Sequence, residues 1–162
     1  MIYERIENYV GEICRLLLPI KHERYIGNGI EIAICVLSSI GLLGKILNDT
    51  KLMNEMAIVG RLLSENKGID EIIKYGIVNK HLKHLIMCGK DSRGHRAGES
   101  LIALSKCGIT KEGVIINSNS PKPRLRSSYQ EVEIFRNRIT IHNLIGETDL
   151  NSIRSYVYKL IQ

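Results

Sequence analysis

The stretch over residues 30–38, IEIAICVLS, is almost continuously apolar and rich in β-branched residues. A parallel strand that is covered on both faces has this composition, because neither of its faces meets water. A second run of the same kind, HLKHLIMCG, covers residues 81–89. The first run predicts a central parallel strand, and the second predicts another buried strand.

Segments with helical spacing of apolar residues lie between further strand-like runs. Helices are predicted over 3–18, 40–49, 68–79, 97–108, 129–138 and 149–161, and shorter strands over 56–60, 113–118 and 139–146. Repeated alternation of strands and helices is typical of a mostly parallel sheet, because parallel neighbours need crossover helices. We therefore expect an α/β fold in one domain, residues 1–162, with a helical extension at residues 1–28.

Composition excludes several classes of protein. The net charge of +6 is spread along the chain, and the four cysteines are too far apart for a disulfide framework, which predicts reduced thiols in a cytoplasmic protein. The longest apolar stretch, residues 32–44, is too short to cross a bilayer. The basic loop with Lys122, Arg124 and Arg126 lacks the aromatic residues that stack on bases, so we expect no binding of nucleic acid.

The segment CGKDSRGHRAG, residues 88–98, follows the second buried run. In parallel sheets ligands bind beyond the carboxyl ends of the strands, which is where His95 falls. The segment lacks the patterns of nucleotide-binding loops, and its simplest alternative is a turn with an exposed histidine. A metal-binding imidazole needs an acceptor on its second nitrogen, for which we nominate Asp91, with Ser92 or a backbone carbonyl as alternatives. Gly94 and Gly98 would let a large flat ligand approach the backbone.

Five segments in order, AICVLSS, GRLLSENKGID, LIMCGKDSRGHRAGESLIAL, GVIINS and FRNRITIHNLIGETDL, resemble the cobamide-carrying A subunit of tetrahydromethanopterin S-methyltransferase from methanogenic archaea. The resemblance covers about residues 30–150. It implies a Rossmann-like three-layer sandwich that binds a corrinoid, such as cobalamin, with His95 as the lower axial ligand of cobalt. It also implies a methyl carrier of methanogenesis that cycles cobalt(I) and methyl-cobalt(III) between methyl-tetrahydromethanopterin and coenzyme M, with separate methyltransferase subunits as partners.

Two departures from the family qualify this expectation. Its membrane-bound members end in a transmembrane helix, whereas this sequence ends at Gln162 after an amphipathic segment, so we expect a soluble relative without sodium transport. The polar loop NSPKPRLR, residues 119–126, replaces a more apolar stretch, and this predicts a different methyl donor or acceptor if the loop touches the corrin or a partner. The alternative function is a non-catalytic protein for corrinoid storage or sensing.

Three loops at the expected ligand edge supply the remaining candidates for contact with the corrinoid. Each candidate also has a local structural explanation, such as capping a helix or closing a turn. The candidates besides His95 are Ser38, Ser39, Ser64, Glu65, Asn66, Gly68, Gly89, Asp91, Ser92, Gly94 and Gly98.

Overall fold

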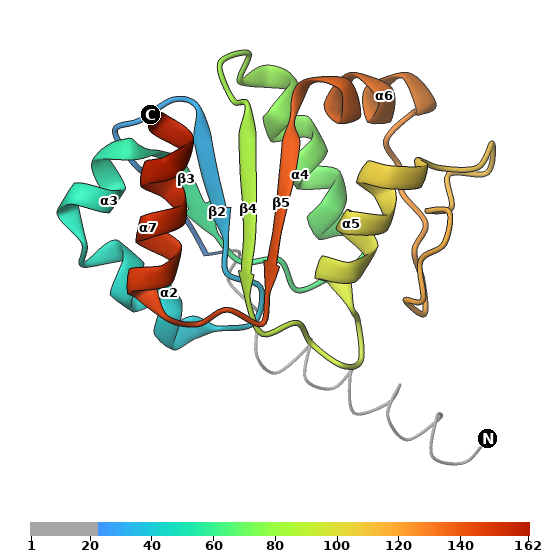
Figure 1. Ribbon diagram of the computed structural model, residues 1–162. Helices are drawn as coiled ribbons and strands as arrows, with labels where there is room; N and C mark the ends of the chain where they lie inside the picture. Colours follow the sequence, from blue (N-terminus) through green and yellow to red (C-terminus); the bar gives the residue numbers. More distant parts are fainter. Residues whose placement is uncertain (1–22) are drawn as a thin grey trace.

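The structure, a computed structural model, describes residues 23–162 and contains a five-stranded sheet between two layers of helices (Figure 1). The strand order is β1-β3-β2-β4-β5, and only β1 runs antiparallel to its neighbour. The strands are β1 (Arg24–Ile26), β2 (Ile32–Cys35), β3 (Met56–Gly60), β4 (His84–Gly89) and β5 (Thr140–Ile145). The predicted α/β three-layer sandwich is confirmed, while the helix expected over 3–18 lies outside the described residues.

Three helices cover each face of the sheet (Figure 1). One face carries α2 (Ile40–Leu47), α3 (Thr50–Glu55) and α7 (Leu150–Ile161), and the other carries α4 (Lys67–Val78), α5 (Ala97–Cys107) and α6 (Tyr129–Arg138). The sheet therefore separates two apolar cores.

The two central strands bury both faces, as their apolar runs predict. Ile34 of β2 and Ile86 of β4 belong to the core under α2 and α7, whereas Cys35 and Met87 belong to the core under α4 and α5. All four side chains are at most 4% exposed. Burying such a side chain stabilises the fold by about 1.5–3 kcal/mol, so these strands fix the position of the loops that follow them.

Polar residues mark the helix ends. Asn66 accepts a hydrogen bond from the backbone N–H of Lys67 at the start of α4, and Ser128 and Glu131 form a capping box at the start of α6. Gly108 ends α5 with φ of 74°, a conformation that favours glycine, as its sequence position predicts.

Three elements differ from expectation. The residues 24–26, assigned above to a helical extension, form the short edge strand β1, and α3 has no counterpart of its own among the predicted helices. The strand predicted over 113–118 is wrong, because this segment makes only isolated bridges, Ile109 with Ile115 and Val114 with Arg124. Since β5 occupies the place beside β4, the segment folds back on itself outside the sheet, and only Ile115 reaches the core.

Candidate functional site

The candidate site lies at the carboxyl ends of β2 and β4. These strands are neighbours in the sheet. The strand that follows β2 in the chain, β3, lies on the outer side of β2, and the strand that follows β4, β5, lies on the outer side of β4. Ligands of open α/β sheets bind where the strand order reverses in this way. The loop from β4 to α5 carries His95, and the loop from β3 to α4 runs beside it.

The imidazole of His95 is held by the carboxylate of Glu65. His95 Nδ1 lies 2.8 Å from Glu65 Oε2, and the other oxygen, Oε1, accepts a hydrogen bond of 3.1 Å from the backbone N–H of Lys122. Glu65 is only 2% exposed, whereas the side chain of His95 is 45% exposed. An ionised carboxylate only accepts hydrogen bonds, so the pairing places a proton on Nδ1, and in the neutral imidazole Nε2 is then the nitrogen with the lone pair.

The remaining nitrogen, Nε2, bonds to no described residue. A neutral imidazole with its proton held on Nδ1 is the arrangement that metal-binding histidines use, with a carboxylate fixing the ring orientation. The pairing can therefore present one metal-ligating nitrogen at the end of the sheet where ligands bind. Within residues 23–162 no group of three or more histidine, cysteine or acidic side chains could hold a metal ion by itself.

Unusual backbone conformations surround this histidine. Leu37, just after β2, has φ of 52°, and Arg96, next to His95, has φ of 45°. Non-glycine residues in the left-handed region cost about 1 kcal/mol or more and persist where the surroundings enforce them. One strained residue lies in the loop after β2 and the other in the loop after β4. Both loops are at the edge of the sheet where ligands bind, which supports a functional role of this edge.

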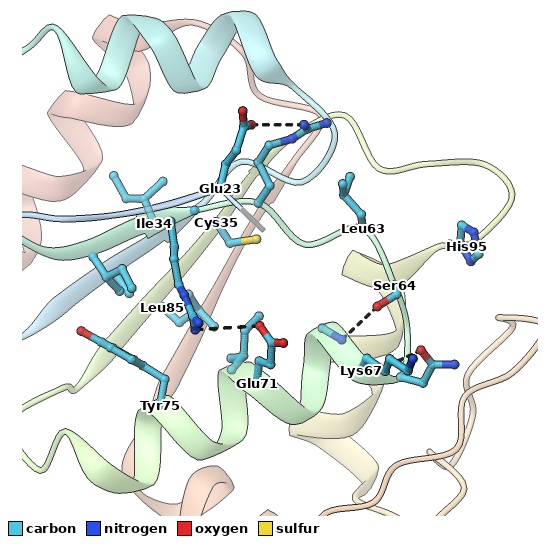
Figure 2. A pocket seen from close by; sticks show the side chains of 18 of the residues that line it. Glu23, Ile34, Cys35, Leu63, Ser64, Lys67, Glu71, Tyr75, Leu85 and His95 are labelled. Atoms are coloured by element: carbon cyan, nitrogen blue, oxygen red, sulfur yellow. Dashed lines mark hydrogen bonds and ion pairs between the residues drawn. The ribbon is translucent and has the colours of Figure 1, made fainter. Parts of the chain in front are cut away.

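A groove of about 660 Å³ opens beside His95 and runs between the sheet and α4 (Figure 2). Its walls are mainly apolar, while ion pairs of Glu23 with Arg61 and of Arg24 with Glu71 lie at its rim. The apolar lining includes Ala33, Cys35, Ile58, Leu63, Ile72 and Leu85. Size and lining are those of sites for organic cofactors, which take up apolar bodies between a few polar contacts.

Ser92 lines the same groove and has an unsatisfied hydroxyl. Its Oγ is buried and has no hydrogen-bond partner among the described residues. Buried hydroxyl groups are nearly always paired, because an unpaired one costs about 1–3 kcal/mol. A polar group of a ligand beside His95 would satisfy this atom.

Asp91 does not hold His95, so the pairing proposed from the sequence is wrong. Asp91 Oδ1 accepts from the N–H of Ser92, and Oδ2 accepts a 3.0 Å hydrogen bond from the N–H of Glu99 in the first turn of α5. The carboxylate therefore caps the beginning of α5. The acid that orients His95 lies 30 residues earlier in the sequence, on another loop.

The two glycines beside His95 have different environments. Apart from its chain neighbours, a Cβ at Gly94 would meet no atom of the described residues within 4 Å, so a side chain has room at this position. A Cβ at Gly98 would lie 2.9 Å from both Asp91 and Leu37, because Gly98 is buried where α5 packs on the sheet. Gly98 therefore cannot give a ligand access to the backbone, contrary to the prediction. Gly94 has space for such an approach.

The remaining predicted residues also take part in local structure. Ser38 donates to the carbonyl of Lys90 at 2.5 Å, Ser39 accepts from the N–H of Lys90, and a Cβ at Gly89 would lie 2.4 Å from a backbone oxygen. Ser64 accepts from the N–H of Gly68 in the first turn of α4. The two serines after β2 thus join their loop to the loop after β4, Ser64 caps α4 within its own loop, and direct contact with a ligand stays a prediction for these residues.

Two cysteines near the edge are not candidate ligands. Cys35 lines the groove and Cys88 lies on the other face of the sheet, and burial raises the pKa of each thiol to about 12. The thiolate is the form that binds metal, so both residues remain neutral near pH 7. Their side chains pack in the two cores instead.

The fold is a Rossmann-like α/β domain. Its candidate site is a histidine bonded to a buried carboxylate, at the point in the sheet where the strand order reverses. The chain belongs to the family formed by the A subunit of tetrahydromethanopterin S-methyltransferase, which matches residues 19–162. In the described part of the chain no helix is long and apolar enough to span a membrane.

Curated relatives agree with this family. The A subunit of the putative methyltransferase Mtx from Methanosarcina mazei is 38% identical over 104 residues, which are 64% of this chain and 60% of that protein. The A subunit of tetrahydromethanopterin S-methyltransferase from Methanosphaera stadtmanae is 29% identical over 145 residues, 88% of this chain and 57% of that protein. The chain thus spans a little over half the length of these relatives.

Proposed function

We propose that this protein binds a corrinoid, with His95 Nε2 as the axial ligand of cobalt, and carries methyl groups between partner proteins. The observation that supports this function best is the pairing of His95 with Glu65. It directs Nδ1 to a carboxylate, while Nε2 has no hydrogen-bond partner among residues 23–162, at the end of the sheet where ligands bind.

The described residues fit such a cofactor in three further respects. Gly94, next to His95 in the chain, has open space around it, Ser92 has a buried hydroxyl without a partner among the described residues, and the apolar groove provides room for an organic body. A bound corrinoid supplies a cobalt centre that can take up a methyl group and give it away again.

The residues of this chain then have separate tasks. His95 binds the metal through Nε2, and Glu65 keeps the ring in place and makes the imidazole a stronger donor by accepting its Nδ1 proton. Because Glu65 is buried and also accepts a hydrogen bond from the backbone N–H of Lys122, its carboxylate would hold the ring of His95 in one orientation toward such a cofactor.

The transfer partners follow from the family. We propose a donor of the methyl-tetrahydromethanopterin kind, a thiol acceptor of the coenzyme M kind, and separate subunits that catalyse the two transfers. The exposed loop with Lys122, Arg124 and Arg126 adjoins the site and would contribute to partner contact.

Reconstitution with hydroxocobalamin tests cofactor binding. We expect the wild type to retain the cofactor with the visible spectrum of a histidine-ligated corrinoid, and His95→Ala to lose this spectrum. His84→Ala is the matched control, since His84 lies at the start of β4, far along the strand from the site, and it should behave as wild type. Identical spectra of wild type and His95→Ala would refute the assignment of the ligand.

Methyl transfer separates a carrier from a storage or sensing protein. The reconstituted protein, methylated on its cofactor, would be mixed with coenzyme M and the membrane fraction of a methanogen. We expect loss of the methyl group to the thiol. Retention of the methyl group in the presence of an active membrane fraction would favour the storage function.

A further inference from the structure

Three serines form a hydrogen-bonded cluster beneath the loop of His95. Ser100 is fully buried in α5, and its Oγ lies 2.8 Å from Ser118 Oγ and within hydrogen-bond distance of Ser120 Oγ. Ser120 itself is 8% exposed. Ser118 is partly buried, so two of the three hydroxyl groups lie away from water, and burying them brings no stability unless they find partners.

One member of the cluster holds the backbone of the candidate ligand. Ser120 Oγ lies 2.6 Å from the carbonyl oxygen of His95 and 3.1 Å from that of Arg96. Arg96 has the left-handed conformation described above, which is unfavourable without support. The hydroxyl of Ser120 therefore stabilises the turn that gives the imidazole its direction.

The same loop also holds the side chain of His95, through Glu65. Two residues after Ser120, the backbone N–H of Lys122 donates to Glu65 Oε1, and Glu65 Oε2 pairs with His95 Nδ1. Farther along, Asp70 accepts hydrogen bonds from the N–H groups of Arg126 and Ser127 and from the hydroxyl of Ser127. The loop over 118–127 is thus fixed at both ends and supports His95 at two points.

We propose that Ser120 is a positioning residue for His95, which sets the direction of Nε2 by holding the peptide group between His95 and Arg96. The role of Nε2 as a cobalt ligand rests on the proposed function, but the positioning itself is a property of the protein without cofactor. Ser120 acts through His95 and touches no reacting atom.

The cluster contains a matched control. Ser100→Ala removes a hydroxyl that is as deeply buried as that of Ser120 and belongs to the same network, but it leaves the bonds from Ser120 to His95 and Arg96 in place. Ser120→Ala removes those bonds. A general loss of stability would appear in both variants, whereas a loss of the fixed orientation of the His95 ring would appear only in Ser120→Ala.

Proton NMR of the cofactor-free protein measures the positioning directly. The Nδ1–H proton of His95, bonded to a buried carboxylate, should give a low-field resonance that disappears in His95→Gln. We expect this resonance to persist in Ser100→Ala and to be lost or broadened in Ser120→Ala, at equal folded fractions by circular dichroism. An unchanged resonance in Ser120→Ala would overturn the proposal, as would its equal loss in both variants.

The cobalamin-loaded protein gives a second and separate readout. Loss of one ordinary hydrogen bond predicts that Ser120→Ala weakens cofactor binding about fivefold relative to Ser100→Ala. If the wild type binds no corrinoid while the NMR result holds, the proposed function fails and the positioning role stands. Equal cofactor affinities in the two variants, with a wild type that binds, would contradict the proposal.

Discussion

The two ends of the parallel sheet use histidine in opposite ways. At the carboxyl end, the buried carboxylate of Glu65 binds one nitrogen of His95, and the other nitrogen has no partner among the described residues beside the groove. Toward the amino end, His84 Nδ1 lies 3.1 Å from His142 Nε2, and His142 Nδ1 lies 2.9 Å from the hydroxyl of Tyr156.

A histidine is available to a ligand when the protein bonds only one of its two ring nitrogens. In the chain from His84 to Tyr156 both nitrogens of the middle ring are bonded inside the protein, so the group joins α7 to the sheet. His95 has one hydrogen bond that orients its ring, through Nδ1, and its Nε2 bonds to nothing in the part of the chain that the structure describes. The comparison predicts that changes at the carboxyl end alter cofactor binding, whereas changes at the amino end alter stability.

The strongest test of this contrast removes the carboxylate. Glu65→Ala should weaken cobalamin binding about 10- to 100-fold, which is typical of the loss of a group that orients a metal ligand. The measurement is a binding titration followed by visible absorption. Tyr156→Phe, which removes the corresponding partner at the amino end, is the control and should bind as wild type. Equal affinities of Glu65→Ala and wild type would remove the distinction between the two ends.

Filling the groove should have a smaller effect. Ile72 lines it from α4, so Ile72→Trp would reduce the space beside His95 and weaken cobalamin binding about tenfold, as expected when about 1.4 kcal/mol of favourable contact is lost. Ile102→Trp on α5 is the matched control, because Ile102 is also partly buried against the same core but does not line the groove. Similar affinities for both variants would show that the ligand does not use the groove.

At the amino end, Tyr156→Phe should lower the free energy of unfolding by about 1 kcal/mol. This is the usual net contribution of one hydrogen bond, here the one between the hydroxyl and His142 Nδ1. Urea denaturation at pH 7.5 measures it. A Tyr158→Phe variant on the same helix, for which no hydrogen bond of the hydroxyl is seen in the described part of the chain, should lose less. Equal losses of unfolding free energy in Tyr156→Phe and Tyr158→Phe would mean that the hydrogen bond to His142 is not the cause.

The smallest expected effect is a dependence of stability on pH. Burial, and secondarily the neighbouring His84, lower the pKa of His142 below its usual value near 6.5. The unfolded chain therefore binds the proton more readily, and stability should fall as the pH drops through about 6.5 toward the lower pKa of the folded state. Denaturation midpoints at pH 7.5, 6.5 and 5.5 should show this decline, and His142→Gln should reduce it. If the midpoint fell equally with pH in the wild type and in His142→Gln, a group other than His142 would cause the pH dependence.

Much of the fold was predictable, because the central strands and long helices carry strong local patterns. The run over 30–38 is apolar on both faces and occupies the sheet centre, and the helix predicted over 68–79 is present as α4. The edge strand β1 has three exposed residues and hence no apolar pattern. The apolar run over 113–118 resembles a strand, but β5 takes the position beside β4, and the run makes only isolated bridges within the described residues.

The site was predictable only in part. The sequence places His95 after a central strand, but short sequence separation favours Asp91 as its partner, and Asp91 caps a helix instead. Glu65 falls among the predicted residues of a neighbouring loop, yet no local pattern marks it as the partner of His95. The contacts of Ser120 with the peptide of His95 could not be predicted, because they join residues 25 positions apart through the fold.

Electron paramagnetic resonance of the cobalt(II) form tests the central claim most directly. The protein would be prepared with 15N-labelled histidine and reconstituted with unlabelled cobalamin, so that only a protein imidazole carries the label. If His95 binds cobalt, the triplet hyperfine splitting of 14N should become the doublet of 15N, and His95→Ala should lose the doublet, while His84→Ala keeps it. A triplet that persists in the labelled wild type would mean that the cofactor's own base, and not His95, binds the metal.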